Sequence, residues 1–290
     1  MSPTAIPGNL ILQSPSNSIW KITSDQVNPP GDAAITYDIT NAGGVFNLRS
    51  TGTVDYEVEW GDGNVEISTL NPLPHTYTAG NYTLGVYSDS VYRPFFNNVT
   101  ADASQITSVT IGPGADLGTN LTNAWFGLSN MTSFVCSFDA TSLVTSFSFT
   151  WFNCSSLASF QLIDTSSGTD FSGAWLNCDS LTNFPLIATS SGTNFSFTWR
   201  DCSSLTSFPA NMFDTTGTLV SGAFDRTWFG CALTAQSIEN ILVSLDTNGA
   251  SSITLGIDGG TNAAKTTWST AAVTAYDNLI VKGWTITFNA

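Results

Sequence analysis

The sequence predicts a mainly β protein in two parts, an antiparallel β-sandwich followed by a solenoid of stacked coils that ends in two α/β units. Three observations predict it. Only 10% of the 290 residues are charged and 42% are hydrophobic, which favours a β-rich chain with a Ser/Thr surface. Apolar and polar residues alternate between positions 33 and 98, and one phrase recurs five times between Leu121 and Leu233.

The first 32 residues are rich in Pro, Asn and Ser, and five prolines interrupt any regular structure. One short strand is expected, over Ile19–Ile22. The segment 1–32 is either the first strand of the following domain or an extended arm that docks on a neighbour. It has no basic start and only three consecutive apolar residues, so we do not expect it to be a secretory signal.

Residues 33–103 are expected to form the β-sandwich. Short runs with period-two alternation cover positions 34–39, 45–48, 54–60 and 82–87. Gly and Asn turns separate such runs, as they do in small antiparallel sandwiches.

Residues 104–233 are expected to form short coils, beginning with a strand over Ile106–Ile111. The repeated phrase is Trp-x-x-Cys-x-x-Leu-x-x-Phe, and its first and last copies are degenerate. The copies begin at Trp125, Trp151, Trp175, Trp199 and Trp228. The Trp-to-Trp spacings of 26, 24, 24 and 29 residues lie in the range of solenoid repeats.

Each coil is expected to contain two regular stretches. Phe171, Trp175 and Cys178 stand at i, i+4 and i+7, which places them on one face of a short helical turn. Period two also fits this stretch in the next coil, so a strand remains an alternative. Leu181–Ile187 has the apolar density of a buried parallel strand. Stacking at about 4.8 Å per coil would join such strands into a continuous sheet over a Trp-Phe-Leu core.

Residues 234–290 are expected to extend the solenoid and to cover its end. Apolar residues at helical spacing predict a helix over Ser237–Leu245, with a capping region from Thr234. A strand over Ile253–Ile257, a second helix over Ala264–Leu279 and a final strand over Gly283–Phe288 follow. A cap of this kind protects an open sheet edge from polymerisation.

Two polar residues of the sandwich invite a functional interpretation. His75 is the only histidine, but its surroundings indicate a structural strand rather than a Ser-His-Asp assembly. Asp62 lies in a Gly-Asp-Gly turn, where a lone Asp is more often a turn former than a calcium ligand. Whether the Asp62 region binds calcium stays open.

Four of the five cysteines hold the same place in successive coils: Cys154, Cys178, Cys202 and Cys231. We expect a column of buried thiols that pack as small hydrophobes. A zinc site would need paired ligands such as Cys-x-x-Cys, which the sequence lacks. Disulfides between neighbouring coils would need favourable geometry. Cys136 falls outside the column and receives no role. We therefore predict no catalytic, metal or cofactor site.

The sandwich residues carry a resemblance to a known family. The turn Trp60-Gly-Asp-Gly63 and the strand His75-Thr-Tyr-Thr-Ala-Gly-Asn-Tyr82 resemble the signature of the PKD family of immunoglobulin-like domains. The Trp60 turn is one or two residues shorter than the commonest spelling. The resemblance covers roughly 65 residues and implies an Ig-like β-sandwich over 33–103.

The coils resemble the BspA-like leucine-rich repeats of surface proteins. That family repeats an aromatic or Met turn, a Cys-x-Ser-Leu core and an Asp-Thr-Ser turn, which Phe138–Ser142 and Phe213–Thr216 match. The resemblance implies an extracellular recognition or adhesion scaffold over 104–290. Phrases after Thr234 look like the C-terminal units of leucine-rich-repeat proteins from bacteriophage genomes.

Two functions remain open. The first is a non-enzymatic structural or adhesive component of a bacteriophage particle, a tail fibre, tail tip or capsid decoration protein located in the virion. Its partners would be other capsid or tail proteins and a host glycan or protein, with homo-oligomerisation left open. The alternative is a cell-surface adhesin of a bacterium or protist.

Other functions fit the sequence poorly. A net charge of −15 argues against nucleic acid as a partner, and no stretch is apolar for long enough to suggest membrane insertion. A polysaccharide-cleaving solenoid would need paired carboxylates, and Asp170, Asp179 and Asp201 do not share one repeat position.

Overall fold

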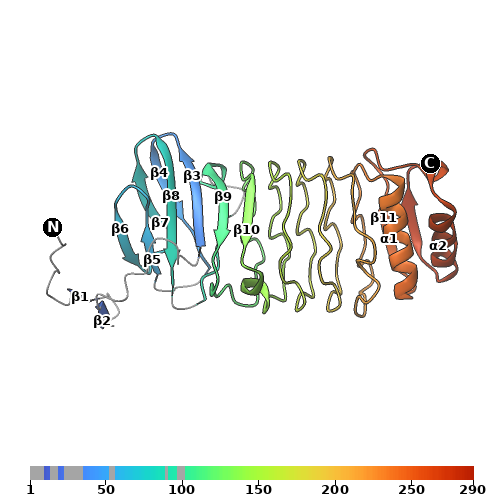
Figure 1. Ribbon diagram of the computed structural model, residues 1–290, viewed down its shortest axis with the longest axis horizontal. Helices are drawn as coiled ribbons and strands as arrows, with labels where there is room; N and C mark the ends of the chain where they lie inside the picture. Colours follow the sequence, from blue (N-terminus) through green and yellow to red (C-terminus); the bar gives the residue numbers. More distant parts are fainter. Residues whose placement is uncertain (1–9, 14–18, 23–34, 52–55, 89–90, 97–101) are drawn as a thin grey trace, which may run out of the picture.

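A computed structural model describes residues 10–13, 19–22, 35–51, 56–88, 91–96 and 102–290. Over these residues the fold is mainly β, with two α-helices and no closed barrel. The body is elongated, with antiparallel strands at one end, coils in the middle and both helices at the other end (Figure 1). The predicted strand positions Ala34, Val54 and Asp55 lie outside the described residues.

The N-terminal segment contains two strands, β1 (Leu10–Gln13) and β2 (Ile19–Ile22). They pair with each other in an antiparallel sheet of their own. The strand predicted at Ile19–Ile22 is thus confirmed, but its partner is β1 rather than the sheet that follows.

A six-stranded sheet comes next, in the order β10-β9-β3-β8-β5-β6. Its strands are β3 (Ile35–Asn41), β5 (Tyr56–Glu59), β6 (Val65–Ser68), β8 (Gly80–Tyr87), β9 (Ile106–Ile111) and β10 (Ser133–Cys136). A separate pair, β4 (Gly44–Leu48) and β7 (Leu73–Tyr77), supplies buried residues to the same core. In β3 every second side chain is buried, as period-two alternation predicts.

The strand predictions for this region are confirmed at β3, β4, β5 and β8. The strand β6 was not predicted, although Val65–Ser68 alternates between apolar and polar residues; its apolar residues Val65 and Ile67 are 59% and 41% exposed. The Tyr77 hydroxyl of β7 donates to the Trp60 carbonyl at 2.8 Å. This bond joins the Trp60 turn to the strand that contains His75 and Tyr77.

The strand β9 joins the antiparallel region to the coils. It pairs with β3 in antiparallel fashion on one edge and with β10 in parallel fashion on the other. A register shift lies between Asp38 and Ile39. Before β9, the Phe96 N–H already donates to the first coil, at 3.2 Å from the Ala124 carbonyl. Hydrogen bonds therefore cross the predicted boundary between residues 103 and 104.

The stretch around each tryptophan is a chain of tight turns. From Phe171 to Asn177 the N–H group of every second residue donates to a carbonyl of the next coil, at 2.8–3.0 Å. The N–H groups of Ala174, Leu176 and Cys178 donate three residues back, at 3.0–3.2 Å. Gly173 and Asn177 take positive φ angles of 60°. The helical turn predicted here is wrong, because half of the N–H groups bond across the stack and two residues are left-handed.

The opposite side of each coil is less regular than predicted. Instead of a continuous sheet over Leu181–Ile187 there is an isolated parallel bridge between Asn183 and Ser207. Ile187 is buried but Leu186 is 52% exposed, so the stretch is not buried throughout. Only at β9 and β10 do the described coils form a regular parallel pair on this side.

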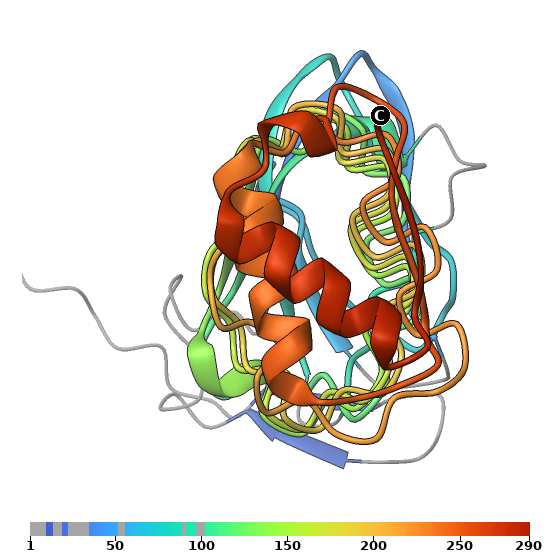
Figure 2. The ribbon, with the colours of Figure 1, turned by 90° about the vertical axis from the view of Figure 1, so that its right-hand side faces the viewer.

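The tryptophans form a stacked column through the coils. Neighbouring indole centroids lie 5.0–5.8 Å apart and the side chains have no exposed surface. Phe160 meets Trp151 and Trp175 edge-on, at 4.8 and 5.1 Å. Viewed along the stack, the coils nearly superpose (Figure 2). The predicted inward face of the repeat is confirmed.

The helix α1 (Ala235–Asn248) closes the last coil with polar side chains. The Ser237 hydroxyl accepts from the Phe208 N–H at 3.0 Å, and the Ser244 hydroxyl accepts from the Phe213 N–H at 2.8 Å. The Asn240 amide donates to the Phe208 carbonyl at 2.9 Å. These side chains of α1 form hydrogen bonds with backbone groups of Phe208 and Phe213, as the backbone of a further coil would.

The remaining elements match the predicted cap. Thr234 caps α1 by accepting from the Ser237 N–H. The strands β11 (Thr254–Ile257) and β12 (Thr285–Phe288) pair in parallel. Between them, α2 (Thr270–Val281) begins later than predicted because Ser269 is its N-cap, and a 3₁₀ turn, η3 (Lys265–Thr267), precedes it. Figure 2 shows both helices across the end of the stack.

We expect Trp175→Ala to lower the free energy of unfolding by about 3–5 kcal/mol, because it opens a cavity between two stacked indoles. Urea unfolding followed by far-UV circular dichroism measures the change. Leu186→Ala, at a 52% exposed position of the same coil, is the matched control and should cost less than about 1 kcal/mol. Equal losses in the two variants would contradict the assigned core.

Candidate functional site

The thiol column is buried and internally bonded. All five cysteines are free, and the four predicted for the column have no exposed surface. Each of those four thiols donates to the carbonyl of the tryptophan one coil earlier, at 3.0–3.3 Å. Burial raises the pKa of each thiol. The prediction of small buried hydrophobes is confirmed, and the alternative of disulfides between coils is not.

Cys136, which received no role, is also buried at the end of β10. Burial and the nearby Asp139 raise the pKa of its thiol to about 12. Its Sγ contacts the Ser137 carbonyl at 3.3 Å. Neither burial nor pKa favours a reactive thiol here.

His75 and Asp62 form a pair that holds the Gly-Asp-Gly turn against β7. The His75 Nε2 lies 2.8 Å from Asp62 Oδ2, and the imidazole stacks on Trp60 with centroids 4.4 Å apart. The other oxygen, Asp62 Oδ1, accepts from the backbone and side-chain nitrogens of Asn64 at 3.0 and 3.1 Å. These contacts agree with the structural roles predicted for His75 in a strand and for Asp62 in its turn, whereas the contact between the two was not predicted.

The three aspartates of the coils have different interactions. Asp170 accepts from the Ser172 N–H at 3.0 Å and so shapes its own turn. Asp201 pairs with Arg200, with Nε and Oδ2 3.0 Å apart. Burial, followed by the charge of Asp201, raises the pKa of Asp179. The structure thus brings Asp179 and Asp201 of neighbouring coils into electrostatic contact, which sequence spacing did not predict.

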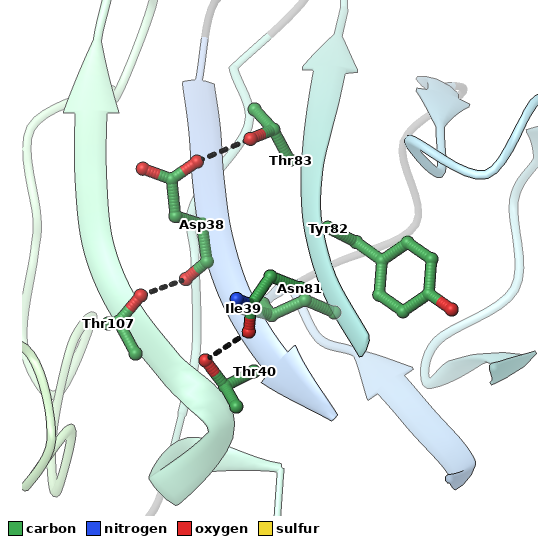
Figure 3. A pocket seen from close by; sticks show the side chains of 7 residues that line it. All are labelled: Asp38, Ile39, Thr40, Asn81, Tyr82, Thr83 and Thr107. Atoms are coloured by element: carbon green, nitrogen blue, oxygen red, sulfur yellow. Dashed lines mark hydrogen bonds between the residues drawn. The ribbon is translucent and has the colours of Figure 1, made fainter. Parts of the chain in front are cut away.

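A shallow hollow of about 300 Å³ lies on the outward face of the six-stranded sheet. It is lined by Asp38, Ile39, Thr40, Asn81, Tyr82, Thr83 and Thr107 (Figure 3). The Asp38 carboxylate accepts from the hydroxyls of Thr83 and Ser108, at 2.6 and 2.5 Å. Thr40 donates to the Asn81 amide oxygen at 2.9 Å. The polar groups drawn here mainly satisfy one another.

The exposed threonines of the coils are also engaged. Thr145, Thr169 and Thr193 each donate through both the backbone N–H and the hydroxyl to a carbonyl of the preceding coil. The hydroxyl bonds measure 3.0–3.1 Å. Surface hydroxyls in this column therefore reinforce the stack, and their donors are not available to a ligand.

A second set of aromatic side chains lies on the outside of the turn ladder. We call this set the outer phenylalanine row; its members are partly exposed Phe126, Phe149, Phe152, Phe197 and Phe229. They stand one residue after or two residues before the column tryptophans. They were not predicted, because a Phe near a core Trp in the sequence was interpreted as a core residue too. Alternation was an available signal only for Phe126, Phe152 and Phe229, which directly follow an inward Trp.

Two kinds of feature are absent from the described residues. Within them, no three His, Cys, Asp or Glu side chains are grouped so that they could hold a metal ion. Nor does the described chain contain a helix with the length and apolar character needed to cross a bilayer.

We expect all five thiols to be unreactive toward a disulfide reagent in the folded protein at pH 8, and all five to react in guanidinium chloride, because each is buried with a raised pKa. Absorbance of the released thiolate measures the reaction. Val65→Cys, at a 59% exposed position, is the control and should add one fast-reacting thiol. Rapid reaction of the native protein would contradict the buried column.

We expect Asp62 to make stability depend on pH. Partial burial opposes its charge, but hydrogen bonds from His75 and Asn64 prevail and hold its pKa below 3.8. A folded pKa below the unfolded one stabilises the fold above the unfolded value, and this contribution disappears as the pH falls through the folded value.

Urea unfolding of the wild type and of Asp62→Asn, compared from about pH 6 to about pH 2, tests this. The variant should be less stable by about 1 kcal/mol at the upper end, and the gap should shrink toward the lower end. His75→Phe keeps a ring on Trp60 and should remove part of the same pH dependence. Parallel stability curves for wild type and variants would show that Asp62 does not titrate as described.

Comparison of the chain with family models, with curated proteins and with solved structures found no match.

Proposed function

We propose that this chain is a non-catalytic structural and adhesive module that presents a rigid recognition surface. The observation that carries the proposal is the continuous hydrogen bonding from β3 through β9 and the coils to β11. The Trp228 N–H, for example, donates to the Gly256 carbonyl of β11 at 3.1 Å. Such a body holds surface residues at fixed distances, which suits recognition of an extended partner.

We further propose that residues 33–103 form an Ig-like sandwich of the PKD type and that residues 104–290 form a variant leucine-rich-repeat solenoid. The turn at Trp60 bound to Tyr77 supports the first assignment. The repeated turns, the parallel bridges between coils and the two α/β units support the second.

The setting that we favour is a bacteriophage particle, as a tail fibre, tail tip or capsid decoration protein. Its support is the resemblance of the coils and their C-terminal units to phage and surface proteins. A surface adhesin of a bacterium or protist is the second candidate, supported by the same BspA-like repeats. In the virion, the N-terminal segment and sandwich would attach to capsid or tail proteins, and the capped end would project.

Gold labelling of each chain end, followed by electron microscopy of purified particles, tests the setting and the orientation. We expect the chain in the particles, with the C-terminal label farther from the shell than the N-terminal label. A C-terminal label against the shell would reverse the orientation. A chain found on the cell envelope and absent from particles would overturn the phage assignment in favour of the adhesin.

A further inference from the structure

Two members of the outer phenylalanine row have a backbone conformation that phenylalanine rarely adopts. Phe149 and Phe197 have φ angles of 51° and 60°, in the left-handed region. They occupy one column with Asn123, Gly173 and Arg226, which also have positive φ; asparagine and glycine suit this conformation better than phenylalanine does. The turn therefore does not need phenylalanine at these positions. Strained residues of this kind persist mainly where function selects them.

The ring of Phe149 lies against the next coil. A Cβ atom at Gly173 would stand 2.5 Å from Cε1 of Phe149, so only glycine leaves room for the ring there. Phe149 is nevertheless partly exposed. Phe152 meets it edge-on at 6.0 Å and stacks on Phe126 at 4.4 Å. These three rings form a partly exposed aromatic platform over the first coils.

A second platform lies farther along the stack. The guanidinium carbon of Arg200 is 5.7 Å from the Phe197 ring centroid and 5.2 Å from that of Phe229. Asp201 balances its charge. Phe149 and Phe197 are two coils apart, which corresponds to about 10 Å at the usual strand spacing. That distance is about the length of two sugar rings.

Two asparagines of the second and third coils, each two residues after the column tryptophan, bond to each other. The Asn177 Nδ2 donates to the Asn153 Oδ1 at 3.2 Å, and both residues are partly exposed. Within the described chain this leaves Nδ2 of Asn153 and Oδ1 of Asn177 without a bonded partner, as one donor group and one acceptor for a ligand.

Flat aromatic faces alternating with neutral amides suit a carbohydrate. The C–H groups of a pyranose ring pack on the electron-rich face of an aromatic ring, and its hydroxyls both donate and accept hydrogen bonds. A nucleic acid also stacks on aromatic rings, but residues 104–233 contain only two basic residues, Arg200 and Arg226, in a chain of net charge −15.

We propose that the outer phenylalanine row binds a linear polysaccharide that runs along the stack, with sugar rings on the platforms at Phe149 and Phe197. This inference rests on the recognition role proposed above, and it names the ligand class and the residues. The coils repeat along the same direction as the polymer, so sugars about 10 Å apart would meet Phe149 and Phe197, with Gly173 in the coil between them.

The test measures binding of the full chain to soluble β-glucan, mannan, dextran and polygalacturonate by affinity electrophoresis. We expect at least one of them to retard the wild type, and the double variant Phe149→Asn, Phe197→Asn to bind at least about tenfold more weakly. Because asparagine tolerates positive φ, the melting temperature of the variant should stay level or rise. Leu186→Asn, at an exposed apolar position on another side of the coils, should bind as the wild type does.

Three results would overturn the inference: no retardation by any of the four polymers, unchanged binding by the double variant, or an equal loss in the Leu186→Asn control. A fall in melting temperature of the double variant would assign the two phenylalanines to packing and also count against it. Particle labelling is a separate measurement, so a chain that is found in particles but fails these tests refutes the ligand and leaves the proposed setting intact.

Discussion

The structure depends on the fact that a single coil cannot bury its own tryptophan. A ring such as Trp175 has apolar faces on both sides, and the indoles of Trp151 and Trp199 cover them at 5.0 and 5.8 Å. Burial of that area is the main favourable term of the fold. The backbone follows from it, because coils this close must exchange hydrogen bonds with each other. The chain does so by sending every second N–H group across the stack.

Polar groups inside the stack fall into two classes, those with a hydrogen-bond partner and those without one. The four thiols of the column and the hydroxyls of Thr145, Thr169 and Thr193 donate to carbonyls of the preceding coil, so these carbonyls have a second donor. The indole Nε1 atoms of Trp151, Trp175 and Trp199 have no conventional partner among the described residues, which would cost about 1–3 kcal/mol each. Phenylalanine rings stand edge-on to the indoles, as Phe184 does to Trp175 at 4.7 Å. Large aromatic contact area compensates for the missing hydrogen bonds.

How much the sequence predicts differs from one element to the next. Strong alternation located β3 and β8, and a cap at Thr234 located α1. The turns around Trp175 were not predicted, because i, i+4 and i+7 spacing indicated a helical turn, period two offered only a strand as the alternative, and only Gly173 and Asn177 hint at left-handed backbone. The hydrogen bonds that Ser237 and Ser244 accept from the N–H groups of Phe208 and Phe213 could not be predicted from a pattern of apolar residues. The platform at Phe149 was missed because strain appears only in the backbone angles.

The two-sided pairing of β9 has a mechanical consequence. A pull or twist on the antiparallel strands passes into the coils through backbone ladders on both edges of β9. Bending at this junction would have to break several hydrogen bonds together, whereas a linker would yield one torsion at a time. A load on the antiparallel strands therefore reaches the coils through paired backbone, and this junction resists bending more than a single connecting segment would.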